Sequence, residues 1–205
     1  MAIAINGSTN VITGVGVGGL PDGIVDTDML AANAVTVAKA TGSVKGITEA
    51  DQWRVTSDFT MGQYATTITS NWERNDTEFE KIGTGFSAPN SSNGHWTFPS
   101  TGIWLIQVQW TGRRSSGNTY YGFHYCHAMN DGNQSNGFDI CTSYVGNGSN
   151  ENANTAFMQA IFDVKDVSTH KVLFGYYDWY TQTTVYMGHT GKNENSYTFL
   201  KLGDT

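Results

Sequence analysis

The first 52 residues contain no phenylalanine, tryptophan or tyrosine, although the chain has 6 Trp, 10 Tyr and 10 Phe. Aromatic side chains bury more apolar area than any other residue type. A segment without them cannot build a core of its own. We therefore expect two parts, an N-terminal arm over residues 1–50 and a globular head over residues 51–205. This layout is typical of a protein that is attached at one end and presents a rigid head at the other.

Charge is also scarce. Asp, Glu, Lys and Arg make up 14% of the chain, against about 25% in a typical soluble domain. The net charge is -7, and Arg113 and Arg114 are an isolated basic pair, so we expect no nucleic-acid partner. No apolar run approaches the roughly 20 residues of a membrane span, and the N-terminus does not resemble a signal peptide. We expect no membrane insertion.

Cysteine is limited to Cys126 and Cys141, too few for a disulfide framework. With His124 and His127 they form the one cluster of metal-ligand residue types. On a strand, His124 and Cys126 share a face and His127 points away, while a hairpin would place Cys126 opposite Cys141. No fourth ligand is evident. We favour free cysteines in the core, with a disulfide and a metal site as the alternatives, and we predict no bound metal.

Two loop motifs resemble cofactor or metal sites without meeting their requirements. Gly14, Gly16 and Gly19 match G-x-G-x-x-G, but a Pro-Asp-Gly turn follows where a dinucleotide site needs a helix. The loop 130–137 faintly resembles a calcium loop, yet it lacks the sixth-position glycine and the late glutamate. We interpret it as a hairpin loop and predict no cofactor.

No catalytic constellation is visible. The G-x-S-x-G elbow is absent, and spacing gives Asp163, Asp166 and Asp178 no partner for acid–base work. The long parallel-coil repeats of polysaccharide-cleaving tailspikes are also absent. We therefore predict that the protein is not an enzyme.

The head shows one strand pattern after another, separated by clusters of turn residues. The predicted strands are 52–59, 94–99, 102–110, 120–129, 138–145, 156–164, 171–180, 183–189 and 197–202. This number suits an antiparallel β-sandwich or jelly roll. In the clearest strand, Trp104, Ile106, Val108 and Trp110 share one face. No helical pattern of ten residues follows Trp53.

Some strands are apolar on both faces. In 171–180, Phe174 and Tyr176 lie on one side and Tyr177 and Trp179 on the other; in 120–129 the odd positions are bulky. A sandwich buries only one face of each sheet, so the second face predicts an exposed patch or an interface. Self-association as a closed homo-oligomer would bury it.

The arm has small apolar pieces. Residues 2–6 predict a short strand, Val11 to Thr13 a second apolar piece, and Asp26 or Thr27 could cap a short helix. A lone helix of this length is unstable, so its narrow apolar face would need partners. We predict that the arm attaches to another protein through Ile3, Ile5, Val11, Leu20, Met29 and Leu30.

Two stretches resemble known families. The segment from Trp96 to Val108 has an aromatic strand followed by Gly-Ile-Trp, and it resembles the strand pair of tumour-necrosis-factor-like jelly rolls, including complement globular heads. Residues 197–203 resemble the closing core strand of the same family. The arm, with Asp-Gly-Ile-Val-Asp-Thr-Asp-Met-Leu-Ala-Ala, resembles N-terminal arms of virion proteins of marine bacteriophages. The resemblance implies an all-β, trimeric jelly-roll head on a phage particle.

From these features we expect a phage virion structural protein, either a tail fibre or a receptor-binding protein. It would be a homotrimer that binds another virion protein through its arm and a host glycan or protein through its head. The candidate ligand residues, which could instead form the trimer seam, are Tyr177, Trp179, Tyr180, Tyr186, Asn133 and Asn150. The alternative is a capsid decoration protein or head fibre; a lectin-like cellular module is a weaker third.

Overall fold

The chain falls into two compact units, residues 1–45 and 46–205. The structure is a computed structural model that describes residues 4–6, 11–13, 46–62, 64–77, 79–114, 120–147, 153–178 and 184–205. In the first unit, β1 (Ala4–Asn6) pairs antiparallel with β2 (Val11–Thr13), with Ile5 opposite Ile12. The predicted helix start and Ile3, Leu20, Met29 and Leu30 lie outside the described residues.

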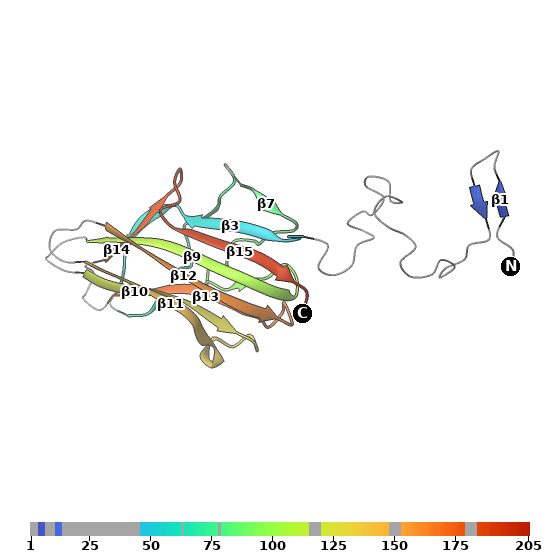
Figure 1. The fold of residues 1–205 in the computed structure, drawn as a ribbon. Coiled ribbons are helices and arrows are strands. Elements are labelled where there is room, and N and C mark those ends of the chain that lie inside the picture. The colour runs from blue at the N-terminus through green and yellow to red at the C-terminus, as the bar shows by residue number, and fades with distance from the viewer. Residues whose placement is uncertain are drawn as a thin grey trace. The chain divides into compact units, whose positions relative to one another are not determined.

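The second unit is an antiparallel sandwich of two sheets, drawn as two layers in Figure 1. The larger sheet has the order β4-β14-β9-β15-β3-β6, with β12 also paired to β9 and β7 to β3. Its strands are β3 (Ala50–Val55), β4 (Ser57–Thr60), β6 (Trp72–Arg74), β7 (Lys81–Ile82), β9 (Gly102–Arg114), β12 (Ala153–Val164), β14 (Thr184–His189) and β15 (Ser196–Gly203).

The smaller sheet has the order β11-β10-β13-β5, with β8 also paired to β13. Its strands are β5 (Thr66–Thr67), β8 (Trp96–Thr97), β10 (Tyr120–Met129), β11 (Phe138–Asn147) and β13 (Lys171–Asp178). The predicted hairpin is confirmed, since β10 pairs with β11 around the short 3-10 helix η3 (Gln134–Asn136), and Cys126 lies opposite Cys141.

The sequence pattern predicted the long strands well and the short ones poorly. Every predicted strand of the head has a counterpart, but 52–59 is two strands: β3 pairs with β15 and β6, and β4, which begins at Ser57, pairs with β14. β5, β6 and β7 were not predicted. Each has two or three residues, too few for an alternating pattern to show.

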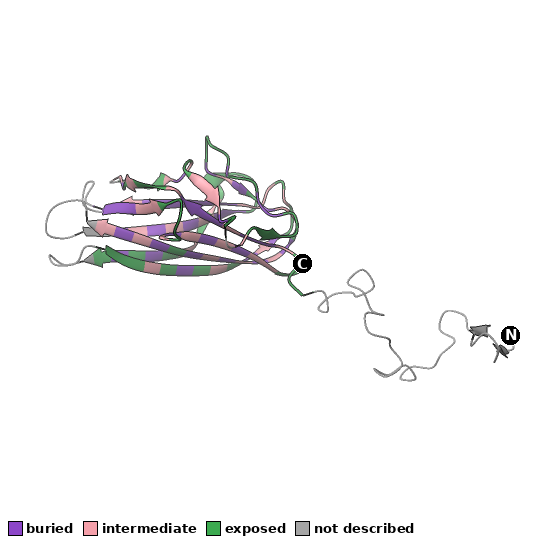
Figure 2. Ribbon diagram, turned by 90° about the horizontal axis from the view of Figure 1, so that it is seen from above, coloured by how far each residue is buried: buried purple, intermediate pink, exposed green. Residues whose placement is uncertain are grey.

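Aromatic rings fill the space between the sheets. Buried and exposed positions alternate along the strands, as Figure 2 shows. The predicted inward face of β9 is confirmed, with Trp104, Ile106, Val108 and Trp110 fully buried. Trp110 also donates its indole N–H to the Ser143 hydroxyl of the opposite sheet at 2.7 Å, which satisfies a buried polar pair and ties the sheets together.

Candidate binding surfaces

Three rings form a row across the outer face of the smaller sheet. The register places Phe123 of β10 between Tyr144 of β11 and Tyr177 of β13. The ring centroid of Phe123 lies 5.3 Å from that of Tyr144 and 5.3 Å from that of Tyr177, with the Phe123 and Tyr177 rings inclined by only 23°. Tyr144 is 52% exposed. We call these three residues the aromatic row; it presents ring surface that the core does not use.

Tyr125 extends the aromatic row along β10. It lies over Gly175 of β13, where a Cβ atom would clash with its ring, so glycine leaves the space that the ring occupies. Its ring centroid is 6.1 Å from that of Phe123. Tyr125 also hydrogen-bonds the Thr67 side chain, and burial raises the pKa of its phenol. The surface beside the aromatic row is thus held in place by side-chain contacts.

The alternation of β10 explains why these rings face outward. Its even positions Gly122, His124, Cys126 and Ala128 are small or polar, and they are buried. At Gly122 a Cβ atom would lie 3.2 Å from the Met61 side chain, so little room exists for bulk on this face. Phe123 and Tyr125 therefore point away from the core, because successive side chains of a strand alternate between its faces, while Met129, beyond the register shift at Cys126/His127, is buried.

The predicted ligand residues separate into different environments. Tyr177 belongs to the aromatic row. Asn133 lies in the β10–β11 loop, where its side chain caps η3 by accepting from the Ser135 N–H. Met129, at the end of β10, is six positions from Phe123, or about 20 Å along a strand, so the loop is not beside the aromatic row. Trp179, Tyr180 and Asn150 lie outside the described residues.

Tyr186 requires a correction. It was expected on the surface, but its side chain is 0% exposed. The pairing of β14 with β4 and β9 turns it inward, where its ring stacks 5.5 Å from that of Trp110. Its hydroxyl hydrogen-bonds the Tyr197 hydroxyl, and burial raises its pKa. Tyr186 is therefore a core residue that no external ligand can reach in the folded head.

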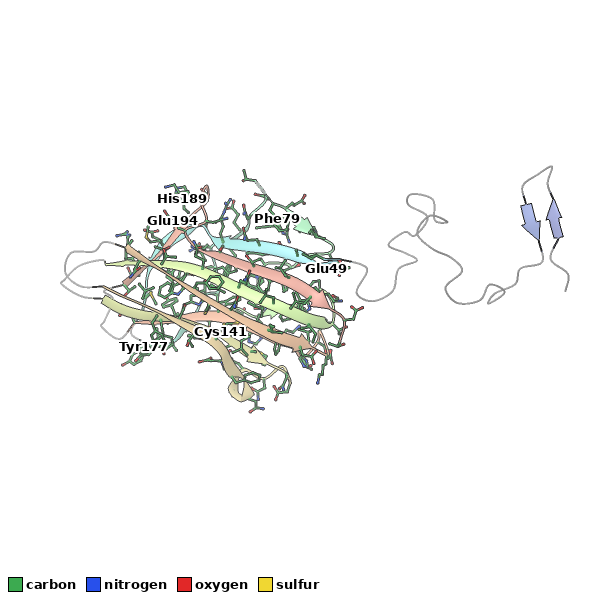
Figure 3. The ribbon with its side chains drawn as sticks, in the orientation of Figure 1. Glu49, Phe79, Cys141, Tyr177, His189 and Glu194 are labelled. Atoms are coloured by element: carbon green, nitrogen blue, oxygen red, sulfur yellow. The ribbon has the colours of Figure 1, made fainter. Side chains whose placement is uncertain are left out.

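Sequence reasoning left Phe123, Tyr125 and Tyr144 out of the predicted site. The signal for the first two was present, since both are bulky odd positions of the 120–129 strand. Tyr144 becomes recognisable only when the hairpin register places it opposite Phe123. Figure 3 shows Tyr177 and Glu49, which immediately precedes β3, at opposite ends of the sandwich. The aromatic row thus lies away from the end where the chain enters the head.

The cysteine and histidine cluster has the predicted faces. His124 and Cys126 point inward, while His127 on the outer face bonds Asp139 at 2.8 Å and is only partly buried. Both cysteines are free thiols. Burial raises the pKa of Cys126, and a hydrogen bond from Cys126 lowers that of Cys141. Among the described residues, no three His, Cys, Asp or Glu side chains are grouped to hold a metal.

His124 is the polar centre of the core beneath the aromatic row. Its Nε2 lies 2.8 Å from the Tyr197 hydroxyl, and burial lowers the pKa of its imidazole to about 3. The ring is therefore neutral at physiological pH. Its centroid lies 5.8 Å from the Trp110 ring and 6.1 Å from the Phe174 ring. This neutral imidazole serves as a packing group that also satisfies a buried hydroxyl.

The outer face of the larger sheet has a different character. Phe157 and Ile161 of β12 are 56% and 64% exposed. The register places Ile161 next to Leu105 of β9, and Leu105 in turn next to Leu200 of β15. Between the two exposed residues lies Gln159, which accepts a hydrogen bond from Gln107 at 3.2 Å. We call these residues the β12 face; a glutamine pair separates its two exposed apolar side chains, and the Asp163–Lys165 ion pair lies beyond Ile161.

The comparisons with known proteins identify the fold. The chain is similar to the Eiger TNF of S. frugiperda, with a TM-score of 0.52 and 12% identity, over 76% of this chain and 93% of that one. It is also similar to murine APRIL, with a TM-score of 0.54 and 12% identity, over 75% of this chain and 98% of that one. No family model matches the sequence, and no curated protein does.

These likenesses establish the fold alone. The head is an antiparallel, TNF-like jelly roll, which confirms the fold expected from the sequence. Within the described part of the chain, no helix is long and apolar enough to cross a membrane. Because one fold can carry many functions, the function must be argued from the two outer faces.

Proposed function

We propose that the protein is a bacteriophage virion structural protein, a tail fibre or receptor-binding protein, with a homotrimeric jelly-roll head. One observation carries the proposal: both sheets of the head have large apolar side chains on their outer faces, the β12 face on the larger sheet and the aromatic row on the smaller sheet. One face can be buried between copies while the other stays available to a partner. The proposed role is binding without catalysis.

The β12 face is the surface that self-association would bury. Large exposed side chains such as Phe157 and Ile161 are costly to leave in water, at about 25 cal/mol per Å² of apolar surface. Protein interfaces are depleted of charge at their centres, and none of the residues that make up this face is charged. A closed, symmetric homo-oligomer would cover it on every copy and leave no open edge of the assembly.

The aromatic row is the surface that would meet a partner. Its rings contact one another, whereas Phe157 and Ile161 of the β12 face are 56% and 64% exposed. Tyrosine is enriched at binding surfaces because a single rigid side chain offers apolar contact and a hydroxyl. Its distance from the chain entry at Glu49 suits presentation to a host glycan or protein.

The arm supports attachment to the particle. Its strands β1 and β2 pair within the first unit, and residues 1–45 contain no aromatic side chain. We propose that the arm's apolar residues, Ile5 and Val11 among them, bind another virion protein, so that the protein is located in the virion. If the arm binds a capsid protein, the protein would instead be a capsid decoration protein or head fibre.

Light scattering tests the assembly. The full chain should have about three times its monomer mass of 22.3 kDa. Phe157→Asn with Ile161→Asn should give monomers, since it removes the two exposed apolar side chains of the β12 face. Tyr144→Asn, an equally exposed change on the opposite sheet, should leave the trimer intact. A monomeric wild-type chain, or a double variant that stays trimeric, would reject this interface.

Labelling tests the position on the particle. Antibodies to residues 1–50, applied to disrupted and intact particles, should locate the arm at the tail. An arm bound to the capsid lattice would reject the tail fibre in favour of the decoration protein. Purified heads should also bind host cells and block infection; heads that do neither would reject receptor recognition.

A further inference from the structure

The described residues form a pocket of about 240 Å³ at one edge of the sandwich. One wall is Phe59 of β4, which is the edge strand of the larger sheet. The other walls are Tyr176 of β13 and the continuous segment 66–71, which begins with β5 at the edge of the smaller sheet. The pocket therefore opens where the edges of the two sheets meet. It is separate from the aromatic row, because Tyr176 and Tyr177 point to opposite faces of β13.

The aromatic wall of the pocket is rigid. The ring centroid of Phe59 lies 5.1 Å from that of Tyr176 and 4.8 Å from that of Tyr186, with the Phe59 and Tyr186 planes 10° apart. Tyr186 in turn stacks on Trp110, with ring centroids 5.5 Å apart and ring planes inclined by 4°. Phe59 is thus the outer end of a three-ring stack that begins in the core. A preformed ring surface spares a ligand the cost of ordering it.

The polar wall carries hydroxyl and amide groups without charge. It contains Thr69, Ser70 and Asn71, and none of the hydrogen bonds within the described residues uses their side chains. Asn71 has a left-handed backbone with φ of 63°, and its carbonyl accepts from the Thr56 N–H at 2.8 Å. The backbone of this wall is therefore held in place, while its side chains remain able to bond a ligand.

The aromatic wall and the uncharged polar wall together indicate the chemical class of the ligand. No Asp, Glu, Lys, Arg or His lines the pocket, so a phosphate or carboxylate would find no countercharge there. A purely apolar ligand would leave the hydroxyl and amide groups unpaired. A sugar ring matches both walls, because its C–H face can lie on an aromatic ring while its hydroxyls bond polar side chains. The volume is below the roughly 300–1,000 Å³ of drug-sized sites, which suits one ring.

We propose that this pocket binds a single neutral sugar unit, with its C–H face on Phe59 and its hydroxyls bonded to Thr69, Ser70 and Asn71. This inference deepens the proposed receptor role and rests on it for the source of the sugar, a host surface glycan. The preference of the pocket for a neutral sugar depends only on the residues that line it.

Calorimetric titration of the full chain tests the proposal. The probes are glucose, galactose, mannose and N-acetylglucosamine, with sialic acid as the charged comparison and a short Thr-rich peptide as the edge-strand comparison. Ser70→Ala with Asn71→Gly should weaken binding by about tenfold or more, since it removes two bonding groups. Glycine at position 71 keeps the left-handed backbone, so the variant should fold with an unchanged Tm.

Tyr144→Ser is the matched control, since it alters the aromatic row and leaves the pocket intact. Saturable binding of a neutral sugar, lost in the pocket variant and kept in the control, supports the proposal. It is overturned if no neutral sugar binds, if only sialic acid or the peptide binds, or if the pocket variant binds as well as wild type. Loss of sugar binding in Tyr144→Ser alone would also overturn it, by assigning the sugar to the aromatic row.

Infection assays separate this inference from the receptor role. Heads that bind a sugar but do not block infection would keep the pocket and reject the receptor function. Wild-type and pocket-variant heads that block infection equally well would keep the receptor function and reject the pocket as the receptor site.

Discussion

β9 and β10 are the long strands at the centres of the two sheets, and they distribute bulk in opposite ways. β9 points its large residues, such as Trp104 and Trp110, into the core and glutamines outward. β10 points small or polar residues inward and large rings, such as Phe123, outward. β9 thus has its largest side chains on the buried face, as expected for a half-buried sheet, whereas β10 has its largest rings on the outer face.

The reversal in β10 has a packing cause. The rings of β9 reach across the core, where the Trp110 centroid lies 5.8 Å from that of His124. Interiors are packed as densely as organic crystals, so a second large ring at position 122 or 126 would not fit. Bulk on the outer face of β10 is therefore not required by the core. This difference separates the rings that fill the core from those that lie on the outer face of the smaller sheet.

Truncating one ring on each strand tests the comparison most directly. Trp104→Ala should lower the free energy of unfolding by about 3–5 kcal/mol, because it empties a fully buried site. Phe123→Ala should cost only about 1–2 kcal/mol, because its ring is half-buried. Urea denaturation of both variants measures the difference. Equal costs would mean that the aromatic row belongs to the core after all.

The polar inner face of β10 predicts a pH dependence. Burial lowers the pKa of His124 from 6.5 to about 3, so below pH 6.5 the unfolded chain takes up a proton that the folded chain does not. The stability from the neutral imidazole is complete above pH 6.5 and is lost as the pH falls. Between pH 7 and 5 the free energy of unfolding should drop by about 2 kcal/mol.

Urea denaturation at both pH values measures this drop. His124→Gln cannot titrate yet can still bond the Tyr197 hydroxyl, so its stability should change little over the same range. Stopping at pH 5 avoids most carboxylate titration. If the free energy of unfolding of His124→Gln fell between pH 7 and 5 as much as that of the wild type, groups other than His124 would cause the effect.

A smaller loss of stability is expected from adding a methyl group between β10 and β13. Gly175→Ala should cost about 1–3 kcal/mol, because the new methyl group meets the Tyr125 ring. In a Tyr125→Ala background the same change should cost less than about 0.5 kcal/mol, and a double-mutant cycle measures the coupling. Equal costs in both backgrounds would show that the Tyr125 ring does not lie over Gly175.

The smallest expected effect is chemical. Iodoacetamide at pH 8 should modify Cys141 in the folded protein well before Cys126, because Cys126 is fully buried and burial raises its pKa. Peptide mass spectrometry of a time course distinguishes the two thiols, and a urea-unfolded sample should lose the difference. Equal rates in the folded protein would show that the inner face of β10 opens readily to solvent.

Sequence periodicity was a good guide where strands are long. The alternation from Gly102 to Trp110 predicted both the strand and its buried face, because side chains of a pleated strand alternate with a period of two. The Asn/Gly-rich loop after Met129 predicted the hairpin, and its length set Cys126 opposite Cys141. The same pattern showed that β10 and β13 have apolar residues on both faces.

Periodicity could not decide which face of a strand is buried when both faces carry aromatic residues or the strand is short. Tyr186 and Tyr177 look alike in the sequence, yet one is in the core and the other on the surface. The pocket was equally hidden, because the segment 66–71 has no pattern and its partner Phe59 lies on the other sheet.

By itself, the sequence determined the all-β head and the apolar residues on both faces of some strands, because these depend on composition and on local alternation; it predicted the arm to end at residue 50, and the structure divides the chain after Lys45. Only the tertiary structure decided which rings fill the core, which form the aromatic row and where the pocket opens. The physical reason is that these features depend on pairing between strands distant in the chain, and the register of such a pair is set by the packing of both sheets together.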